Sequence, residues 1–236
     1  MRYWLVMPAA GAGRRFGSAK QYAPLAGRTV LELALQPFLA DQRCAGGCVV
    51  LAGDDAQRTQ LARQLPAQFL IATGGRERAH SVHNGLLALA AHLQPEDWVL
   101  VHDAARPCLS AADLARLLEQ GASDSVGAQL AVPLADTLKR AEGSGPAMAR
   151  IAQTVPREGL WLAQTPQMFR YAALRGALER AMAAERMPTD EAQAMEWCGL
   201  CARLVAAQDS NPKVTGAADL ALAEAILATR SKQPCA

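Results

Sequence analysis

The chain opens with an apolar run at residues 3–7 and continues into the loop sequence PAAGAGRRFGSAKQ at residues 8–21. A short continuous apolar run predicts a buried first β-strand, and the three glycines that follow it let the backbone approach a ligand closely. Backbone N–H groups in such a loop can point toward anionic oxygens, and Arg14, Arg15 and Lys20 add full positive charges. The loop therefore predicts a binding site for a polyphosphate.

Two familiar glycine-rich motifs do not fit this loop. The dinucleotide fingerprint needs G-x-G-x-x-G at the opening of a helix, with an acidic residue about 20 residues further on. Here the third glycine comes one place late, and no acidic residue ends a strand at that distance. The Walker sequence needs a glycine directly before its lysine, but Ala19 precedes Lys20. A merely flexible glycine turn remains an alternative, although it gives no reason for three cations beside three glycines.

The composition is that of an ordinary globular protein. The 236 residues are 51% hydrophobic and 19% charged, which is enough for one large domain with a substantial core. A net charge of +2 gives no support for nucleic-acid binding, which normally needs a strongly basic face. No apolar run reaches the roughly 18 residues of a membrane span. The absence of a signal sequence before the first strand predicts a cytoplasmic location.

The six cysteines allow a zinc-site alternative, because Cys44 and Cys48, and Cys198 and Cys201, have spacings that could supply thiolates. Each pair falls against a predicted strand or helix rather than in a tight turn. A cytosolic chain of this size also has little need of disulfides. The sequence therefore favours buried, reduced thiols.

Apolar runs and helical patterns alternate along the first half of the chain. Strands are predicted at residues 48–52, 69–72 and 98–102, and helices at 30–39, 55–64 and 111–120, with a further long helix ending at residue 93. This alternation predicts an α/β, Rossmann-like fold, in which helices cover both faces of a mostly parallel sheet. Ligands bind such sheets at the C-terminal ends of the strands. We therefore expect residues 8–21, 74–81 and 103–106 to meet at one edge.

The alternation stops at about residue 134. Residues 136–140 and 149–155 flank a turn rich in Gly, Ser and Pro and predict a long β-hairpin, with another strand at 162–169. Such a hairpin cannot easily bury itself alone, so we expect an arm over about residues 134–161 that packs on a second copy of the chain. Helices at 172–184, 190–198 and 217–229 and a strand at 202–206 complete a single domain, residues 1–236.

Two charged residues outside the first loop are candidates for the same site. Asp103 follows a predicted strand, and an acid in that place beside a phosphate-binding loop can hold Mg²⁺. The alternative is that Asp103 caps a turn and pairs with Arg106. Lys213 lies just past the last predicted strand and adds a cation to the same edge, although alone it would be an ordinary loop lysine.

Together these motifs resemble a known enzyme family. The sequences at residues 8–22, GGRERAHSV at 74–82 and VHDAARP at 101–107 closely resemble those of the 2-C-methyl-D-erythritol 4-phosphate cytidylyltransferases, CTP-dependent enzymes of the non-mevalonate isoprenoid pathway. Further matches lie at residues 136–140, 154–161, 164–167, 189–192 and 211–215. The resemblance therefore covers nearly the whole chain.

The resemblance implies transfer of CMP from CTP to 2-C-methyl-D-erythritol 4-phosphate, with release of pyrophosphate. The substrate phosphate would attack the α-phosphate in line, assisted by Mg²⁺ or another divalent cation at Asp103. The catalytic cations would be Arg15, Lys20 and Lys213. CTP would be bound by Ala9, Ala10, Gly11, Ala12, Gly13, Gly75 and Ser81. The acceptor would be bound by Asp103, Arg106 and Thr189, and by Thr137 and Arg157 of a partner subunit in a homodimer.

Three alternatives remain open at this stage. A cytidylyltransferase for ribitol 5-phosphate or another polyol phosphate would share the CTP site, although Thr137, Arg157 and Thr189 favour methylerythritol phosphate. A dinucleotide-binding oxidoreductase is disfavoured by the late glycine and the missing acid. A non-catalytic nucleotide sensor would not need Arg106, Arg157 and Thr189 beside the triphosphate cations.

Overall fold

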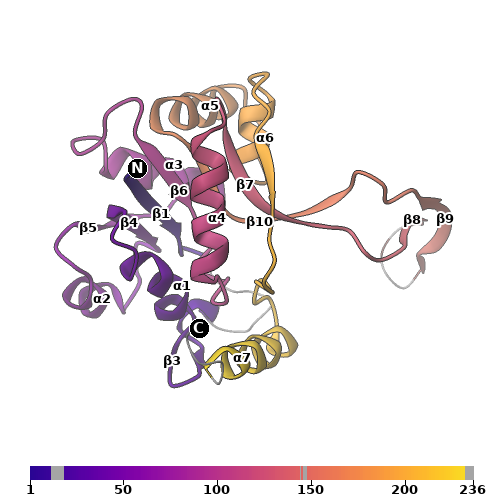
Figure 1. Ribbon diagram of the computed structural model, residues 1–236, viewed down its shortest axis with the longest axis horizontal. Helices are drawn as coiled ribbons and strands as arrows, with labels where there is room; N and C mark the ends of the chain where they lie inside the picture. The colour runs from indigo at the N-terminus through magenta and orange to yellow at the C-terminus, as the bar shows by residue number, and fades with distance from the viewer. Residues whose placement is uncertain (12–18, 144, 146–147, 232–236) are drawn as a thin grey trace.

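The computed structural model describes residues 1–11, 19–143, 145 and 148–231. Within these residues one sheet contains seven strands, in the order β11-β7-β10-β6-β1-β4-β5 (Figure 1). Their bounds are Tyr3–Pro8 (β1), Cys44–Leu51 (β4), Phe69–Thr73 (β5), Trp98–Val101 (β6), Gly127–Pro133 (β7), Trp161–Arg170 (β10) and Arg203–Ala206 (β11).

Most neighbouring strands in this sheet run parallel. β1 lies parallel to β4 and β6, β4 to β5, and β11 to β7. β10 is antiparallel to both of its neighbours, β6 and β7. The prediction of a mostly parallel sheet is therefore confirmed.

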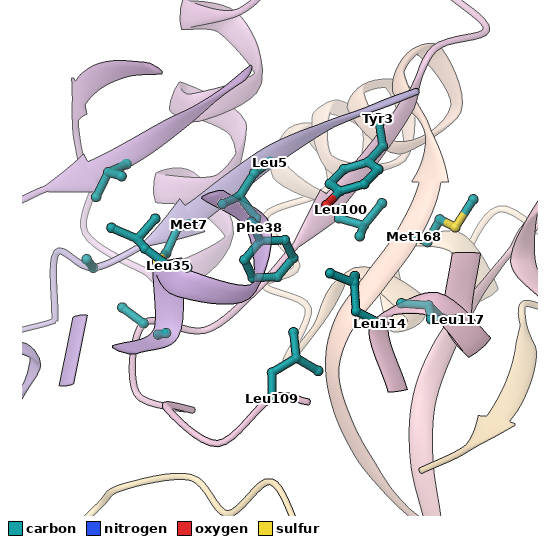
Figure 2. Close-up of a cluster of buried hydrophobic side chains, with 14 of the residues drawn as sticks. Tyr3, Leu5, Met7, Leu35, Phe38, Leu100, Leu109, Leu114, Leu117 and Met168 are labelled. Atoms are coloured by element: carbon teal, nitrogen blue, oxygen red, sulfur yellow. The ribbon is translucent and has the colours of Figure 1, made fainter. Parts of the chain in front are cut away.

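Helices pack on both faces of the sheet (Figure 1). Because successive side chains of a strand point to opposite faces, Leu5 and Val6 of β1 enter two separate cores. The first core joins Leu5 to Phe38 and Leu114 (Figure 2), and the second joins Val6 to Leu86. The helices are Val30–Leu39 (α1), Arg58–Gln64 (α2), Arg78–Ala88 (α3), Ala111–Ala122 (α4), Tyr171–Ala183 (α5), Glu191–Glu196 (α6) and Ala217–Ser231 (α7).

Two helix starts follow directly from their capping residues. The hydroxyl of Thr29 accepts a hydrogen bond from the Glu32 backbone N–H at 3.2 Å, and Glu32 Oε2 accepts one from the Thr29 N–H at 2.7 Å. This reciprocal pair satisfies donors at the start of α1, as its sequence predicts. Ser110 caps α4 with a single hydrogen bond, in which its hydroxyl accepts from the Asp113 N–H at 3.1 Å.

Several element boundaries differ from the prediction. Helix α3 begins at Arg78 and ends at Ala88, before the predicted end at residue 93. The prediction ran too far because Leu89 and Leu93, which lie beyond the helix, continue the apolar pattern and are buried. Helix α2 begins three residues later than expected. Strand β7 was not predicted, since its apolar run directly precedes the point where the alternation stops. The prediction of buried thiols is wrong for Cys201, which is exposed, whereas Cys48 and Cys108 are buried.

The predicted hairpin is present and stands away from the sheet. Its strands are β8 (Leu138–Glu142) and β9 (Arg150–Val155), which pair antiparallel at the end of an extension that continues from β7 and β10 (Figure 1). Large apolar side chains are exposed along it, with Met148 69%, Ile151 67% and Leu162 56% exposed. We refer to residues 134–161 as the arm.

The remaining described elements are small. A 3-10 helix, η1, spans Lys20–Tyr22, and β2 (Pro24–Leu25) pairs with β3 (Arg28–Thr29). Helix α7 packs over this region through Ala223. Among the helices of the described residues, none combines the length and the apolarity that crossing a membrane requires.

Candidate active site

A pocket lies at the edge where the predicted loops were expected to meet. Strands β1, β5 and β6 all end beside it, and the segments that follow these strands form its wall. This meeting of three loops far apart in sequence is the arrangement that a parallel sheet dictates. The predicted site residues that line it are Ala9, Ala10, Gly11, Lys20, Gly75, Ser81, Asp103 and Lys213.

One wall of the pocket is a tight contact between two loops. A Cβ atom on Gly74 would lie 2.3 Å from the Cβ of Ala10 and 2.9 Å from Ser81 Oγ, so only glycine fits there. The buried Ser81 hydroxyl accepts a hydrogen bond from the Gly75 N–H at 3.1 Å and donates one to the Glu77 carbonyl at 3.3 Å. Ser81 therefore fixes the shape of the loop that carries Gly75.

Gln21 connects the two ends of the first loop. Its side chain is 5% exposed, and its Nε2 donates to the carbonyl of Ala9 at 3.0 Å. Ala9 is held to the sheet in turn, because its N–H donates to the Val50 carbonyl at 2.8 Å. The position of η1, which begins with Lys20, is thus tied to the end of β1.

We expect Gln21→Met to raise the KM for a nucleotide substrate roughly tenfold, because losing one buried hydrogen bond costs about 1–2 kcal/mol and frees this loop end. Steady-state kinetics measures the change. The matched control is Gln42→Met, at an exposed glutamine that does not line the pocket. A KM equal to that of the control would contradict the role given to Gln21.

A row of alternating charges ends in the pocket, where Arg78, Asp103 and Lys213 line it, while Glu191 is buried behind Arg78. Glu191, the first residue of α6, accepts from Nη1 and Nη2 of Arg78 at 2.6 and 2.9 Å. Nε of Arg78, in the first turn of α3, donates to Asp103 Oδ1 at 2.9 Å. Lys213 Nζ donates to Asp103 Oδ2 at 2.6 Å. We call these four residues the charge row.

The cations in the charge row keep Asp103 ionised. Burial alone would raise the pKa of Asp103, but the adjacent positive charges of Arg78 and Lys213 outweigh this and hold the pKa well below its usual range. Burial likewise raises the pKa of Glu191, and Arg78 acts against that shift. At neutral pH the pocket therefore presents a carboxylate at Asp103, which is suited to cations and to hydroxyl donors.

The backbone of Asp103 is fixed by a buried relay. The Asp103 N–H donates to Thr165 Oγ1 at 3.0 Å, and Thr165 Oγ1 lies 3.0 Å from Nδ1 of His102, whose Nε2 lies 3.0 Å from the Arg106 carbonyl. A carbonyl can only accept, so Nε2 carries the proton and Nδ1 accepts from the Thr165 hydroxyl. Burial lowers the pKa of His102 to about 4, which keeps the ring neutral at pH 7.

We expect Thr165→Val to lower the free energy of unfolding by about 1–3 kcal/mol, because it leaves the buried Asp103 N–H and His102 Nδ1 without this partner. Urea denaturation at pH 7 measures the loss. Thr165→Ser keeps the hydroxyl and should lose less than half as much. Equal stability of the valine variant and the unmodified protein would show that the relay contributes nothing.

The alternative in which Asp103 caps a turn and pairs with Arg106 is borne out only by the backbone, where the Arg106 N–H donates to the Asp103 carbonyl at 3.0 Å; the described side chains form no ion pair between them. The Arg106 guanidinium instead donates to the carbonyls of Asn211 at 2.8 Å and Ala163 at 3.4 Å, and it does not line the pocket. Burial lowers the pKa of Arg106. Its proposed contact with the acceptor stays a prediction.

Three other predicted residues also lie outside the lining of this pocket. Thr137 and Arg157 are exposed at the base of the arm, just before β8 and just after β9, and Arg157 donates to the Ala135 carbonyl. Thr189 is exposed two residues before Glu191. Of the remaining predicted residues, Ala12, Gly13 and Arg15 lie outside the residues that the structure describes.

Comparison with known proteins gives one consistent result. Residues 3–229 match the family model IspD, 2-C-methyl-D-erythritol 4-phosphate cytidylyltransferase. The chain belongs to this family. The cytidylyltransferase of Ectopseudomonas mendocina is 49% identical over 235 residues, covering 98% of each chain, and that of Acidithiobacillus ferrooxidans is 50% identical over 242 residues, covering 98% of this chain and 99% of the relative.

Solved structures agree with this membership of the IspD family. A crystal structure of a 4-diphosphocytidyl-2C-methyl-D-erythritol synthase superimposes with a TM-score of 0.83 at 36% identity, covering 96% of this chain and 99% of that one. The IspD structure from Francisella tularensis gives a TM-score of 0.79 at 30% identity, covering 96% and 100%. The chain is therefore a cytidylyltransferase, which confirms the enzyme class that the resemblance implies and excludes the oxidoreductase.

Sequence reasoning missed three members of this IspD site. Arg78 and Glu191 stand inside motifs that were recognised, but a lone arginine and a lone glutamate gave no sign that they would meet across 113 residues. Thr165 also stands in a recognised motif, residues 164–167, and in a predicted strand, but neither gave it a role in the site. Arg78 and Glu191 are the first residues of α3 and α6, whereas Thr165 lies within β10.

Proposed function

We propose that the pocket binds CTP together with 2-C-methyl-D-erythritol 4-phosphate and transfers CMP between them. The substrate phosphate would attack the α-phosphate of CTP, the bond to the β-phosphate would break, and pyrophosphate would leave. The products would be 4-diphosphocytidyl-2-C-methyl-D-erythritol and pyrophosphate. The observation that supports this most strongly is that Lys20, Asp103 and Lys213 line one pocket in a member of the IspD family.

The nucleotide would lie against the wall made by the first loop and the loop after β5. Ala9, Ala10 and Gly75 offer backbone groups with little side-chain cover, which suits recognition of a base edge. The N–H of Gly75 already donates to Ser81, so its carbonyl is the backbone group that remains for the base. The triphosphate would continue along Gly11, and its predicted contacts with Ala12 and Gly13 involve residues outside those that the structure describes.

The cations around the pocket would stabilise the reacting phosphate. Negative charge builds on the equatorial oxygens of the α-phosphate as the attacking oxygen approaches, and fixed cations contribute most at that point. Lys20 and Lys213 both line the pocket, and Arg15 would add a third charge from the first loop. A phosphate monoester is largely deprotonated at neutral pH, so its attack needs no general base.

The residues present fit a divalent cation. Asp103 is ionised, lies beside the triphosphate loop and presents Oδ2 on the side of Lys213. Mg²⁺ characteristically binds one or two carboxylates together with substrate phosphates, and when bound it would neutralise charge on the triphosphate oxygens. Asp103 would be the residue that holds it.

The acceptor pocket would be completed by a second subunit. Thr137 and Arg157 stand on the arm, outside the pocket of their own chain, while the arm exposes Met148 and Ile151 to solvent. Packing of the arm on a second copy would bury this apolar surface and carry both polar residues toward the partner. Residues 1–236 would thus act as a single nucleotidyltransferase domain whose arm, about residues 134–161, makes a homodimer.

The substrates also indicate where the enzyme would work. CTP and a sugar phosphate are highly charged metabolites of the cell interior, so we expect a cytoplasmic enzyme. The membrane and nucleic acids have no part in this reaction.

Pyrophosphate release tests the proposal. Purified protein with Mg²⁺ should release pyrophosphate from CTP and methylerythritol phosphate, and not when ATP, GTP or UTP replaces CTP. Ribitol 5-phosphate, offered in parallel, should be inactive. Release with ribitol 5-phosphate alone would move the chain to the polyol-phosphate alternative, and no release with any pair would refute the proposed function.

A further inference from the structure

The two oxygens of Asp103 have partners that differ in how firmly they are held. Oδ1 accepts from Arg78, whose side chain is 25% exposed and whose other two nitrogens are bound by Glu191. Oδ2 accepts from Lys213, whose side chain is 40% exposed and extends from the loop after β11. An arginine fork bound at both ends is far more restricted than a lysine with a flexible stem.

Glu191 is itself fixed in the fold. Its side chain is 1% exposed and it opens α6, where the next residue, Ala192, donates its N–H to Gln167 Oε1 at 2.9 Å. Gln167 lies on β10 and is 1% exposed, and its Nε2 donates to Asp190 Oδ2 at 2.9 Å. The sheet therefore holds the start of α6, and α6 holds the carboxylate that binds Arg78.

We propose that Glu191 and Arg78 are positioning residues. They hold Oδ1 of Asp103 in place and leave Oδ2 as the oxygen that contacts the substrates. This proposal rests on the proposed function, since it takes Asp103 as a residue that meets them. In this structure Lys213 occupies Oδ2; when phosphate enters, Lys213 can move to it while Arg78 keeps the carboxylate oriented.

The geometry gives this pair a role that simple stability does not require. A buried ion pair seldom stabilises a fold better than apolar side chains of the same size, and replacing both partners together is often neutral. Besides its bonds to Glu191, Arg78 donates to Asp103, and both Arg78 and Asp103 line the pocket. Removing the charges of Arg78 and Glu191 together should therefore leave the protein folded but displace the Asp103 carboxylate.

The test is the double variant Arg78→Met/Glu191→Leu. We expect it to fold, with a kcat about 100-fold lower, because small displacements of a positioned group cost about that much. The KM for CTP should change less than about threefold, since the walls that hold the base are untouched. The single variant Glu191→Gln keeps an oxygen that accepts from one guanidinium N–H, so it should retain most of the kcat of the unmodified protein. The matched control is Arg43→Met/Asp41→Asn, which removes another paired arginine and carboxylate outside the pocket.

Each outcome bears on the proposal. A folded double variant with the kcat of the control would overturn it, and so would an equal loss from Glu191→Gln. If the double variant fails to fold, Arg78→Lys decides, because lysine keeps the charge but cannot bridge both carboxylates. Arg78→Lys with full kcat would also overturn the proposal. Asp103→Asn separates a failure of the proposed site from a failure of the positioning role. If Asp103→Asn is fully active, the proposed site is refuted. If Asp103→Asn is inactive while the double variant is active, only the positioning role is refuted.

Discussion

Lys213→Ala is expected to lower kcat about 10²–10³-fold without unfolding the protein, which is the usual effect of removing one preorganised group that stabilises transition-state charge. The side chain is 40% exposed and its ammonium group donates to Asp103 Oδ2 at 2.6 Å, so its loss opens no large cavity. Asp103 keeps Arg78 as a partner. Stopped assays of pyrophosphate release measure kcat, and circular dichroism measures whether the variant is folded.

An exposed arginine outside both the pocket and the arm controls for the loss of charge. Arg63 lies in the last turn of α2, and Arg63→Ala should keep its kcat within about twofold. Lys213→Arg keeps the charge but changes the shape of the donor, so it should recover only part of the activity. If Lys213→Ala turns over as fast as the control, Lys213 does not act on the reacting phosphate.

The second large effect is recovery of activity when two inactive variants share one dimer. Lys213→Ala and Arg157→Ala, each expressed with a different tag, should each be nearly inactive alone. If Arg157 acts in the partner's pocket, a mixed dimer contains one pocket with both an intact Lys213 and an intact Arg157. Tandem purification of mixed dimers should then give about half of the normal activity per dimer, from one working site of two.

A second pair of variants serves as the control for this recovery. Lys20 and Lys213 line the same pocket of one chain, so a mixed dimer of Lys20→Ala and Lys213→Ala has no intact site and should stay inactive. Activity that fails to rise for the Arg157 pair would mean that Arg157 works within its own chain or not at all. Failure to isolate mixed dimers would refute the arm as a dimer contact.

The general fold could be predicted from the sequence because its signals are local. Apolar strands alternate with helices, and a reciprocal Thr29–Glu32 cap defines the start of α1 at the predicted residue. The edge where the pocket lies follows from the parallel sheet alone. Strand β7 was missed because its apolar run, Gly127–Pro133, is followed by the arm rather than by a helix.

The detailed chemistry of the site could not be predicted in the same way. Asp103 was placed at the correct edge, but its partners come from α3 and from the loop after β11, 25 and 110 residues away. From the sequence, Glu191 is an ordinary acidic residue at the start of a helix. Its buried pair with Arg78 could not be predicted, because only tertiary packing brings Arg78 to it. The predicted contacts of Thr137 and Arg157 with the acceptor need a second chain, whose packing is not a local property of the sequence.

The most direct test of the account is a crystal structure of the protein with CTP and Mg²⁺. The account predicts the cytosine beside Gly75 and Ser81, the triphosphate between Lys20 and Lys213, and the metal ion near Asp103 Oδ2 while Oδ1 stays with Arg78. Nucleotide bound away from this pocket, or a triphosphate that leaves both lysines without phosphate contact, would contradict it.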